Sequence, residues 1–258
     1  MIPPLDEARA QLRTLLRARR QALAPVVRMA AAEAVAERLR MRAELSSARH
    51  VGGYWAVRGE LPLHALLSPA LGACRTWSAE SENRPQRGQF LPGLQPNSPA
   101  IGQKDGEKWT AAVDLQPAIS KSDRLPGFVY CLPCLAPGGR LRFAPWQPGG
   151  SLIQNRYGIP EPDPASGSRL APDELDVVLV PLVGFDRHGA RLGAGGGYYD
   201  RSFAFLQQQQ RPGRPLLIGI GYDMQEIDAL PHQPWDVPMD LVVTPTRTLV
   251  FGAGARES

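Results

Sequence analysis

Residues 176–201 read DVVLVPLVGFDRHGARLGAGGGYYDR, and this stretch decides the fold. The first ten residues are nearly all apolar, which is typical of a parallel strand covered on both faces. Residues 186–189 predict a tight turn, after which a glycine-rich loop leads into a helix from about Tyr198 to Gln210. The order strand, loop, helix favours an α/β fold.

The segments on either side repeat this alternation of helices and apolar strands. Leucines at three- and four-residue spacing predict a first helix that Pro25 closes, and an alanine-rich stretch predicts a second helix from about Val26 to Leu45. A short helix is expected at 61–71, and further strands at 50–57, 128–135, 215–222 and 241–244. We therefore expect an α/β three-layer sandwich with a mostly parallel central sheet flanked by helices.

The composition is that of a globular protein with an unusual share of loops. Of 258 residues, 43% are hydrophobic and 21% charged, which excludes collagen, a coiled coil and disorder of the whole chain. The 26 prolines and 26 glycines indicate loop-rich structure. Residues 78–127 show no sustained periodicity and predict an irregular insert. We expect one domain over 1–258, with this insert and a short tail from about 252.

The net charge of +4 comes from one segment. Residues 1–50 hold ten arginines and five acidic residues, whereas the other 208 residues carry a net charge of −1. A nucleic-acid-binding protein that uses a basic N-terminal helix stays an alternative, although no known nucleic-acid module is present. The sequence shows neither an apolar run of about 18 residues nor a signal peptide, so we expect a cytoplasmic protein without membrane contact.

The glycine-rich loop is the strongest candidate for chemistry. Successive glycines let backbone N–H groups converge on an anion, a helix start adds its positive dipole end, and Arg191 can neutralise phosphate charge. The loop matches neither the Walker A nor the G-x-G-x-x-G pattern. A tight turn that needs glycine for positive φ is the alternative explanation.

Several other side chains could complete a nucleotide site, each with a plainer explanation. Asp200 and Asp236 are hard-oxygen ligands suited to Mg²⁺, or simply a helix-start acid and a loop acid. An arginine every four residues from Arg9 through Arg13 to Arg17 lines one helix face, either as a phosphate clamp or as a solvated surface.

Two further features suggest a second ligand and a buried pair of thiols. Trp55 could stack on a heterocycle that Glu60 hydrogen-bonds, although Glu60 could also be a helix-start acid. Cys131 and Cys134 form a lone C-x-x-C, for which buried strand cysteines are the default and a zinc or redox site the alternative.

Together these segments resemble the 5-formyltetrahydrofolate cyclo-ligase family in four blocks. The first is RAQLR at 9–13, the second YWAVRGE at 54–60 and the third YGIPEP at 157–162. The fourth is residues 176–201, followed by 219–245. Ala194 departs from the pattern, because relatives often carry tyrosine or a basic residue there, and the insert at 78–127 has no counterpart.

The resemblance implies a fold like that of ribose-5-phosphate isomerase and the CoA transferases, and a monomer. It also implies ATP- and Mg²⁺-dependent cyclisation of 5-formyltetrahydrofolate to 5,10-methenyltetrahydrofolate, with release of ADP and phosphate. A small-molecule kinase that uses the same nucleotide site is the second alternative.

The resemblance also implies roles for individual residues. Arg191 and Tyr199 would be catalytic, Trp55 and Glu60 would bind the folate, and Asp200 and Asp236 would bind Mg²⁺. The residues implied for ATP are Arg9, Arg13, Arg191, Leu192, Gly193, Ala194, Gly195, Gly196, Gly197, Tyr198 and Tyr199, of which those from Ala194 to Tyr198 would also contact the folate.

Overall fold

The structure is a computed structural model that describes residues 5–67, 127–163 and 169–251. All three ranges belong to one compact unit, made of residues 1–70 and 121–258. The predicted insert at 78–127, apart from Gly127, and the predicted tail from 252 lie outside the described residues. Both therefore stay predictions.

A seven-stranded sheet forms the centre, in the order β11-β10-β9-β6-β1-β2-β3. Its five inner strands, from β10 to β2, pair in parallel, whereas the edge strands β11 and β3 are antiparallel. The strands are β1 (His50–Gly52), β2 (Val129–Ala136), β3 (Arg140–Pro145), β6 (Val177–Pro181), β9 (Leu216–Ile220), β10 (Leu241–Val243) and β11 (Thr248–Val250). The predicted, mostly parallel α/β sheet is confirmed.

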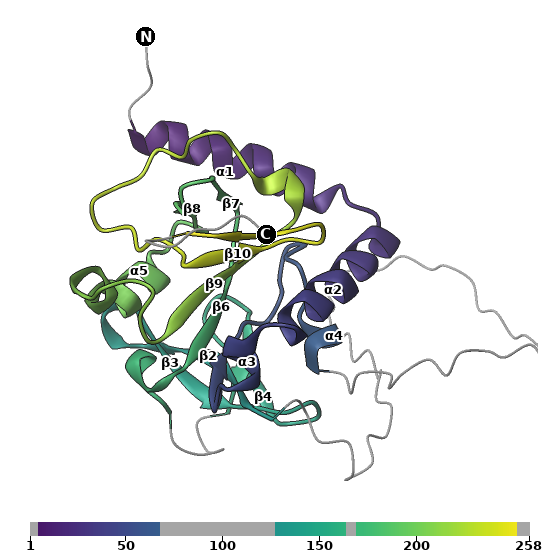
Figure 1. The fold of residues 1–258 in the computed structure, drawn as a ribbon, viewed down its shortest axis with the longest axis vertical. Coiled ribbons are helices and arrows are strands. Elements are labelled where there is room, and N and C mark those ends of the chain that lie inside the picture. The colour runs from purple at the N-terminus through teal and green to yellow at the C-terminus, as the bar shows by residue number, and fades with distance from the viewer. Residues whose placement is uncertain (1–4, 68–126, 164–168, 252–258) are drawn as a thin grey trace, which may run out of the picture. The chain divides into compact units, whose positions relative to one another are not determined.

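Helices cover both faces of this sheet. Since successive strand residues point to opposite sides, alternate residues of one strand pack against different helices. Val177 and Leu179 of β6 pack in a core with α2 (Pro25–Arg40), α3 (Ala43–Ser46) and α4 (His64–Leu67). Val178 and Val180 pack in a second core with α5 (Tyr198–Phe203) and the following 3-10 helix, Ala204–Gln208. Figure 1 shows α2 and α5 on opposite sides of the strands, which gives the three expected layers.

The first helix, α1 (Leu5–Gln21), covers the end of the sheet rather than a face. It lies over the small hairpin of β7 (Gly184–Phe185) and β8 (Arg191–Leu192), as Figure 1 shows. Leu16 is buried there in a core with Val183, Leu192 and Leu230. Because the hairpin follows β6, α1 brings its arginines to the carboxyl ends of the parallel strands, where open α/β sheets bind ligands.

The remaining elements are short. A hairpin of β4 (Leu152–Gln154) and β5 (Pro160–Pro162) lies outside the main sheet, and three single-turn 3-10 helices span Pro137–Gly139, Pro172–Glu174 and Asp223–Gln225. No helix within the described residues is both long and apolar enough to cross a membrane.

Several predicted boundaries were wrong for local reasons. The strand expected at 50–57 ends at Gly52, because the Tyr130 hydroxyl lies against Gly53 and accepts the backbone N–H of Tyr54 at 3.1 Å. The strand expected at 176–185 breaks after Pro181, which has no N–H for a sheet ladder.

Three predicted helices differ from the structure. The helix predicted over 61–71 begins only at His64, as α4, and its part beyond Leu67 lies outside the described residues. The helix predicted over Val26–Leu45 is two helices, since α2 ends at Arg40 and α3 starts at Ala43. The helix predicted over Tyr198–Gln210 is α-helical only to Phe203 and continues as a 3-10 helix. Strands β3, β4, β5, β8 and β11 were not predicted at all.

Candidate active site

A pocket of about 480 Å³ opens at the carboxyl ends of the parallel strands. Its walls come from α1, the loop after β1, the β4–β5 hairpin and the glycine-rich loop before α5. The predicted site residues that line it are Arg9, Arg13, Trp55, Glu60, Arg191, Gly193, Ala194, Gly195, Gly196, Gly197, Tyr198, Tyr199, Asp200 and Asp236. Leu192 does not line it, because its side chain is buried against α1.

The arginine stripe of α1 lies over the glycine-rich loop. Arg13 donates from Nε to the Gly193 carbonyl at 3.0 Å, and Arg17 donates to the Ala194 carbonyl at 2.8 Å. Burial, together with the charges of Arg9 and Arg17, lowers the pKa of Arg13. The solvated-surface explanation of the stripe is therefore wrong for Arg9 and Arg13, and the crowded positive charge favours an anion at this position.

The loop itself uses glycine where the backbone requires it. Gly195 and Gly197 have φ of +100° and +64°, a region that side-chain-bearing residues rarely adopt. Residues 194–196 are exposed towards the pocket. Because α5 has only six residues, the dipole at its start is weaker than the predicted 13-residue helix would provide. The arginines and the open loop backbone are therefore the main features that suit a phosphate.

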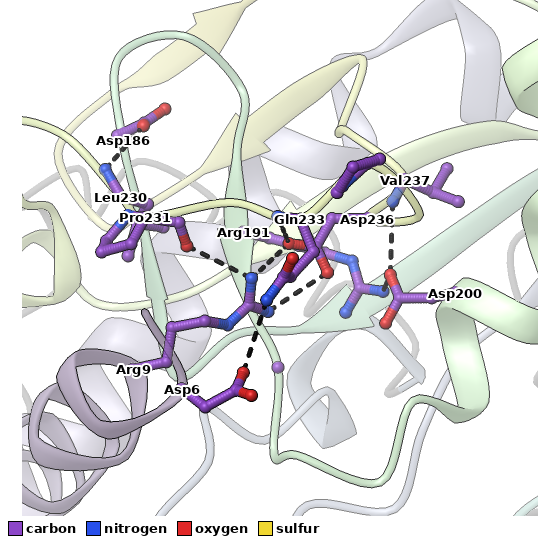
Figure 2. Close-up of polar contacts among 12 residues, drawn as sticks. Asp6, Arg9, Asp186, Arg191, Asp200, Leu230, Pro231, Gln233, Asp236 and Val237 are labelled. Carbon is purple, nitrogen blue, oxygen red and sulfur yellow. Dashed lines mark hydrogen bonds and ion pairs between the residues drawn. The ribbon is translucent and has the colours of Figure 1, made fainter. Parts of the chain in front are cut away.

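Asp236 is held by an arginine at one end of the pocket. Arg9 donates through both terminal nitrogens to the carboxylate and also to the Pro231 carbonyl at 3.2 Å (Figure 2). The backbone N–H of Gln233 donates to the same carboxylate at 2.8 Å. Burial acts to raise the pKa of Asp236, but the donated hydrogen bonds outweigh it, so the pKa is lowered. Asp236 is therefore an ionised, oriented carboxylate.

Asp200 forms a second, adjacent pair. Arg191 donates to Asp200 Oδ1, and the same oxygen accepts the backbone N–H of Val237 at 3.3 Å (Figure 2). Since Val237 follows Asp236, the two carboxylates that the sequence analysis singled out lie in neighbouring segments. The Arg191 guanidinium also lies 5.6 Å from the ring centroid of Tyr199. The plain explanation of Asp200 holds as well, because it lies in the first turn of α5.

Trp55 and Glu60 also line the pocket. Trp55 is partly exposed and lies edge-on to Trp146, with ring centroids 5.8 Å apart. Glu60 starts no helix, since α4 begins at His64; its Oε2 instead accepts the Val57 N–H at 3.1 Å. Burial raises the pKa of Glu60. The helix-start explanation of Glu60 is wrong, and the residue is a mostly buried acceptor beside the pocket.

Two tyrosines line the pocket together, and the sequence analysis gave a ligand role to Tyr198 but none to Tyr157. Tyr198 and Tyr157 share a hydrogen bond of 2.7 Å between their hydroxyls, and Arg156 donates to the Tyr198 hydroxyl at 2.6 Å. These hydrogen bonds lower the pKa of Tyr198. Tyr157 lies within the YGIPEP block, which was the available signal, but only the fold brings it to Tyr198.

The C-x-x-C pair is buried in β2 and lies outside the pocket lining. Residues three apart on a strand point to opposite faces, so Cys131 and Cys134 do not face each other. Burial raises the pKa of the Cys131 thiol to about 12 and that of Cys134 to about 11. The default explanation of buried strand cysteines is confirmed. No cluster of three or more metal-ligating side chains occurs in the described ranges.

Residues 122–245 match the model of the 5-formyltetrahydrofolate cyclo-ligase family. The chain is 39% identical to the 5-formyltetrahydrofolate cyclo-ligase of Escherichia coli K12 over 145 residues, which cover 55% of this chain and 74% of that protein. It is 40% identical over 115 residues to the Haemophilus influenzae protein of the same name, covering 43% of this chain and 59% of that one.

The fold is similar to that of two solved structures. One is the NMR structure of Aquifex aeolicus 5,10-methenyltetrahydrofolate synthetase, with a TM-score of 0.63, 22% identity and coverage of 97% of this chain and 96% of that chain. The other is a 5,10-methenyltetrahydrofolate synthetase from Mycoplasma pneumoniae, with a TM-score of 0.55, 18% identity and coverage of 92% and 98%. At these identities the likeness concerns the fold.

Proposed function

Because this chain belongs to the 5-formyltetrahydrofolate cyclo-ligase family, we propose that it closes 5-formyltetrahydrofolate to 5,10-methenyltetrahydrofolate in a reaction that consumes ATP and requires Mg²⁺. The observation that carries this proposal is that two different surfaces line the same pocket. One surface is cationic and suits a triphosphate, and the other pairs an aromatic ring with a buried carboxylate.

The nucleotide lies, in this proposal, between α1 and the glycine-rich loop. Arg13 and Arg17 already contact loop carbonyls at 3.0 and 2.8 Å, so their guanidinium groups flank the exposed loop backbone. Arginine offers several N–H donors in a planar fork that matches phosphate oxygens. The same contacts argue against the nucleic-acid alternative, because these arginines turn towards the pocket rather than away from the protein.

The residues present fit a magnesium ion. Asp200 and Asp236 are hard-oxygen donors in neighbouring segments, and Asp200 Oδ2 has no hydrogen-bond partner among the described residues. Mg²⁺ is typically held by one or two carboxylates together with substrate phosphates, so two are enough. The ion would neutralise phosphate charge there. Arg9 and Arg191, which now pair with these carboxylates, are then available to the phosphate oxygens.

The folate lies against Trp55 and Glu60. A pterin ring offers a flat face and a row of N–H donors, which suit stacking and a carboxylate acceptor respectively. Ala194 contributes only backbone or methyl contact where a longer side chain would reach further.

The chemistry needs positioning and charge neutralisation rather than a side-chain nucleophile. The formyl oxygen attacks the γ-phosphorus and the bond to ADP breaks. The second folate nitrogen then attacks the formyl carbon and gives up its proton to solvent, and phosphate leaves. Arg191 stabilises the transferred phosphoryl group. Burial raises the pKa of Tyr199, so its hydroxyl stays protonated while its ring supports the Arg191 guanidinium.

The deciding experiment mixes the protein with 5-formyltetrahydrofolate, ATP and Mg²⁺ and follows the near-ultraviolet absorbance of the methenyl product. We expect a signal that requires both ATP and Mg²⁺. Folded protein that gives no such signal refutes the proposal. A kinase that phosphorylates a different acceptor would give no methenyl product in this mixture, so the absorbance separates the kinase alternative.

A further inference from the structure

Arg20, in the last turn of α1, connects three segments around the pocket. Its side chain is almost fully buried, with 2% of the residue exposed, and it lines the pocket wall. It donates to the Leu182 carbonyl just after β6 at 3.0 Å and to the Arg58 carbonyl at 3.1 Å. One of its terminal nitrogens lies 3.9 Å from Glu60 Oε1. Among the polar contacts of the described residues, no other residue of α1 reaches both the segment after β6 and this carboxylate.

The segment that Arg20 holds is a tight turn with an unusual backbone. The Glu60 N–H donates to the Val57 carbonyl at 3.0 Å, and Glu60 Oε2 accepts the Val57 N–H in return. Both central residues have positive φ, 52° for Arg58 and 78° for Gly59. Positive φ suits Gly59 but is uncommon for Arg58, so the surroundings must hold the turn in this form. The hydrogen bonds between Glu60 and Val57 close the turn, and the hydrogen bond from Arg20 to the Arg58 carbonyl ties it to α1.

Arg20 also sets the charge around Glu60. The cations that face this carboxylate are Arg20 and Arg17 from α1 and Arg58 from the turn, and the buried tyrosines near it are Tyr54 and Tyr199. Burial raises the pKa of Glu60, and the positive charge of Arg20 opposes that rise. Arg20 is itself buried enough for its own pKa to be lowered.

We propose that Arg20 is a positioning residue for the folate: it fixes the turn at 57–60 against α1, so that the Glu60 carboxylate is presented to the ring of the substrate in one orientation. This inference rests on the proposed function, because it takes Glu60 as the acceptor for the N–H groups of the pterin. It adds a link between the nucleotide side of the pocket, where α1 contacts the glycine-rich loop, and the folate side.

The test compares Arg20→Gln and Arg20→Lys with the matched control Arg19→Gln. Arg19 is exposed on the same turn of α1 and makes no polar contact with another described residue. In Arg20→Gln, we expect the KM for 5-formyltetrahydrofolate to rise by about tenfold or more, as the loss of hydrogen bonds from a charged group implies. The KM for ATP should change by less than about twofold, which is within the variation of distant sites. Arg20→Lys should recover part of the loss. The control Arg19→Gln should keep the wild-type KM values.

The pH profile gives a readout that a purely structural role would not move. Without the Arg20 charge the pKa of Glu60 rises, so the acid limb of kcat/KM for the folate should shift to higher pH in Arg20→Gln. In Glu60→Gln that limb should disappear.

The outcomes separate the inference from the proposed function. A wild-type protein without ATP-dependent ring closure refutes the function. An active wild type whose Arg20 variants keep the folate KM and the acid limb refutes the inference alone, as does an equal rise in both KM values. Thermal unfolding of each variant completes the test, since loss of the fold in both Arg20 variants would assign Arg20 a structural role instead.

Discussion

Replacing Asp236 with asparagine removes the charge that holds α1 to the segment before β10. The two side chains of the Arg9–Asp236 pair are only 9% and 10% exposed, and the carboxylate also accepts the Gln233 N–H. Hydrogen bonds to charged groups contribute about 1.5–3 kcal/mol each, and breaking a buried pair costs about 3–5 kcal/mol. Asparagine keeps one acceptor oxygen, so we expect a loss of about 2–3 kcal/mol in the free energy of unfolding.

The assay is thermal unfolding with a matched surface variant. For a chain of this size, about 2–3 kcal/mol corresponds to a Tm lower by about 5–10 °C. Asp228→Asn serves as the control, because Asp228 is exposed and makes no polar contact with another described residue. The expected difference in Tm between Asp236→Asn and Asp228→Asn is several degrees. A difference of less than about 1 °C would show that the Arg9–Asp236 pair does not stabilise the fold as argued.

The same pair makes a pH prediction with a definite sign. Burial acts to raise the pKa of Asp236, but Arg9 and the Gln233 N–H lower it overall. A carboxylate with a depressed pKa in the folded state stabilises the protein above its unfolded pKa of about 3.9, and the contribution is lost as the pH falls through the folded value. The free energy of unfolding of Asp236→Asn should therefore fall less steeply at acid pH than that of the wild type.

Three further changes test other parts of the structure. A Cβ at Gly53 would lie 1.9 Å from a tyrosine hydroxyl, so Gly53→Ala should lose about 3 kcal/mol of stability in denaturant titration, whereas Gly127→Ala, whose Cβ would meet no described atom within 4 Å, should not. Burial raises the thiol pKa of Cys131 to about 12 and that of Cys134 to about 11, so neither should react with a thiol reagent at pH 8 in the folded protein. With the third cysteine changed to serine, labelling should occur only after unfolding. Rapid labelling of the native protein would contradict this. Asp200→Ala should abolish turnover while the circular dichroism spectrum stays unchanged, and near-normal turnover would remove Asp200 from the proposed metal site.

The fold was largely predictable because the inner strands are continuous apolar runs. Residues 177–180 and 217–220 are buried on both faces, which is what their composition indicated. The edge strand β3 was missed because its burial alternates and it includes Arg140 and Arg142. The early end of β1 depends on packing against Tyr130, which is distant in sequence, so a local pattern does not contain it. The break after Pro181 is marked by the proline itself, although the continuous apolar run hid it.

The candidate site was predictable as a set of residues but not as an arrangement. The spacing of the arginines in α1 showed that they share a face, and the fold turns that face onto the glycine-rich loop. The sequence did not show that Arg9 pairs with Asp236, because 227 positions separate them. Arg20 was missed for the same reason, since its partners at 58 and 182 are brought to it only by the fold.

The central claim is that phosphoryl transfer and ring closure occur together in this pocket, and the most direct test is their stoichiometry. Phosphate release and methenyl absorbance are measured in the same reaction under limiting 5-formyltetrahydrofolate. The proposed mechanism predicts one phosphate released for each methenyl product formed. ATP turnover without methenyl product, or methenyl product formed without ATP, would contradict it.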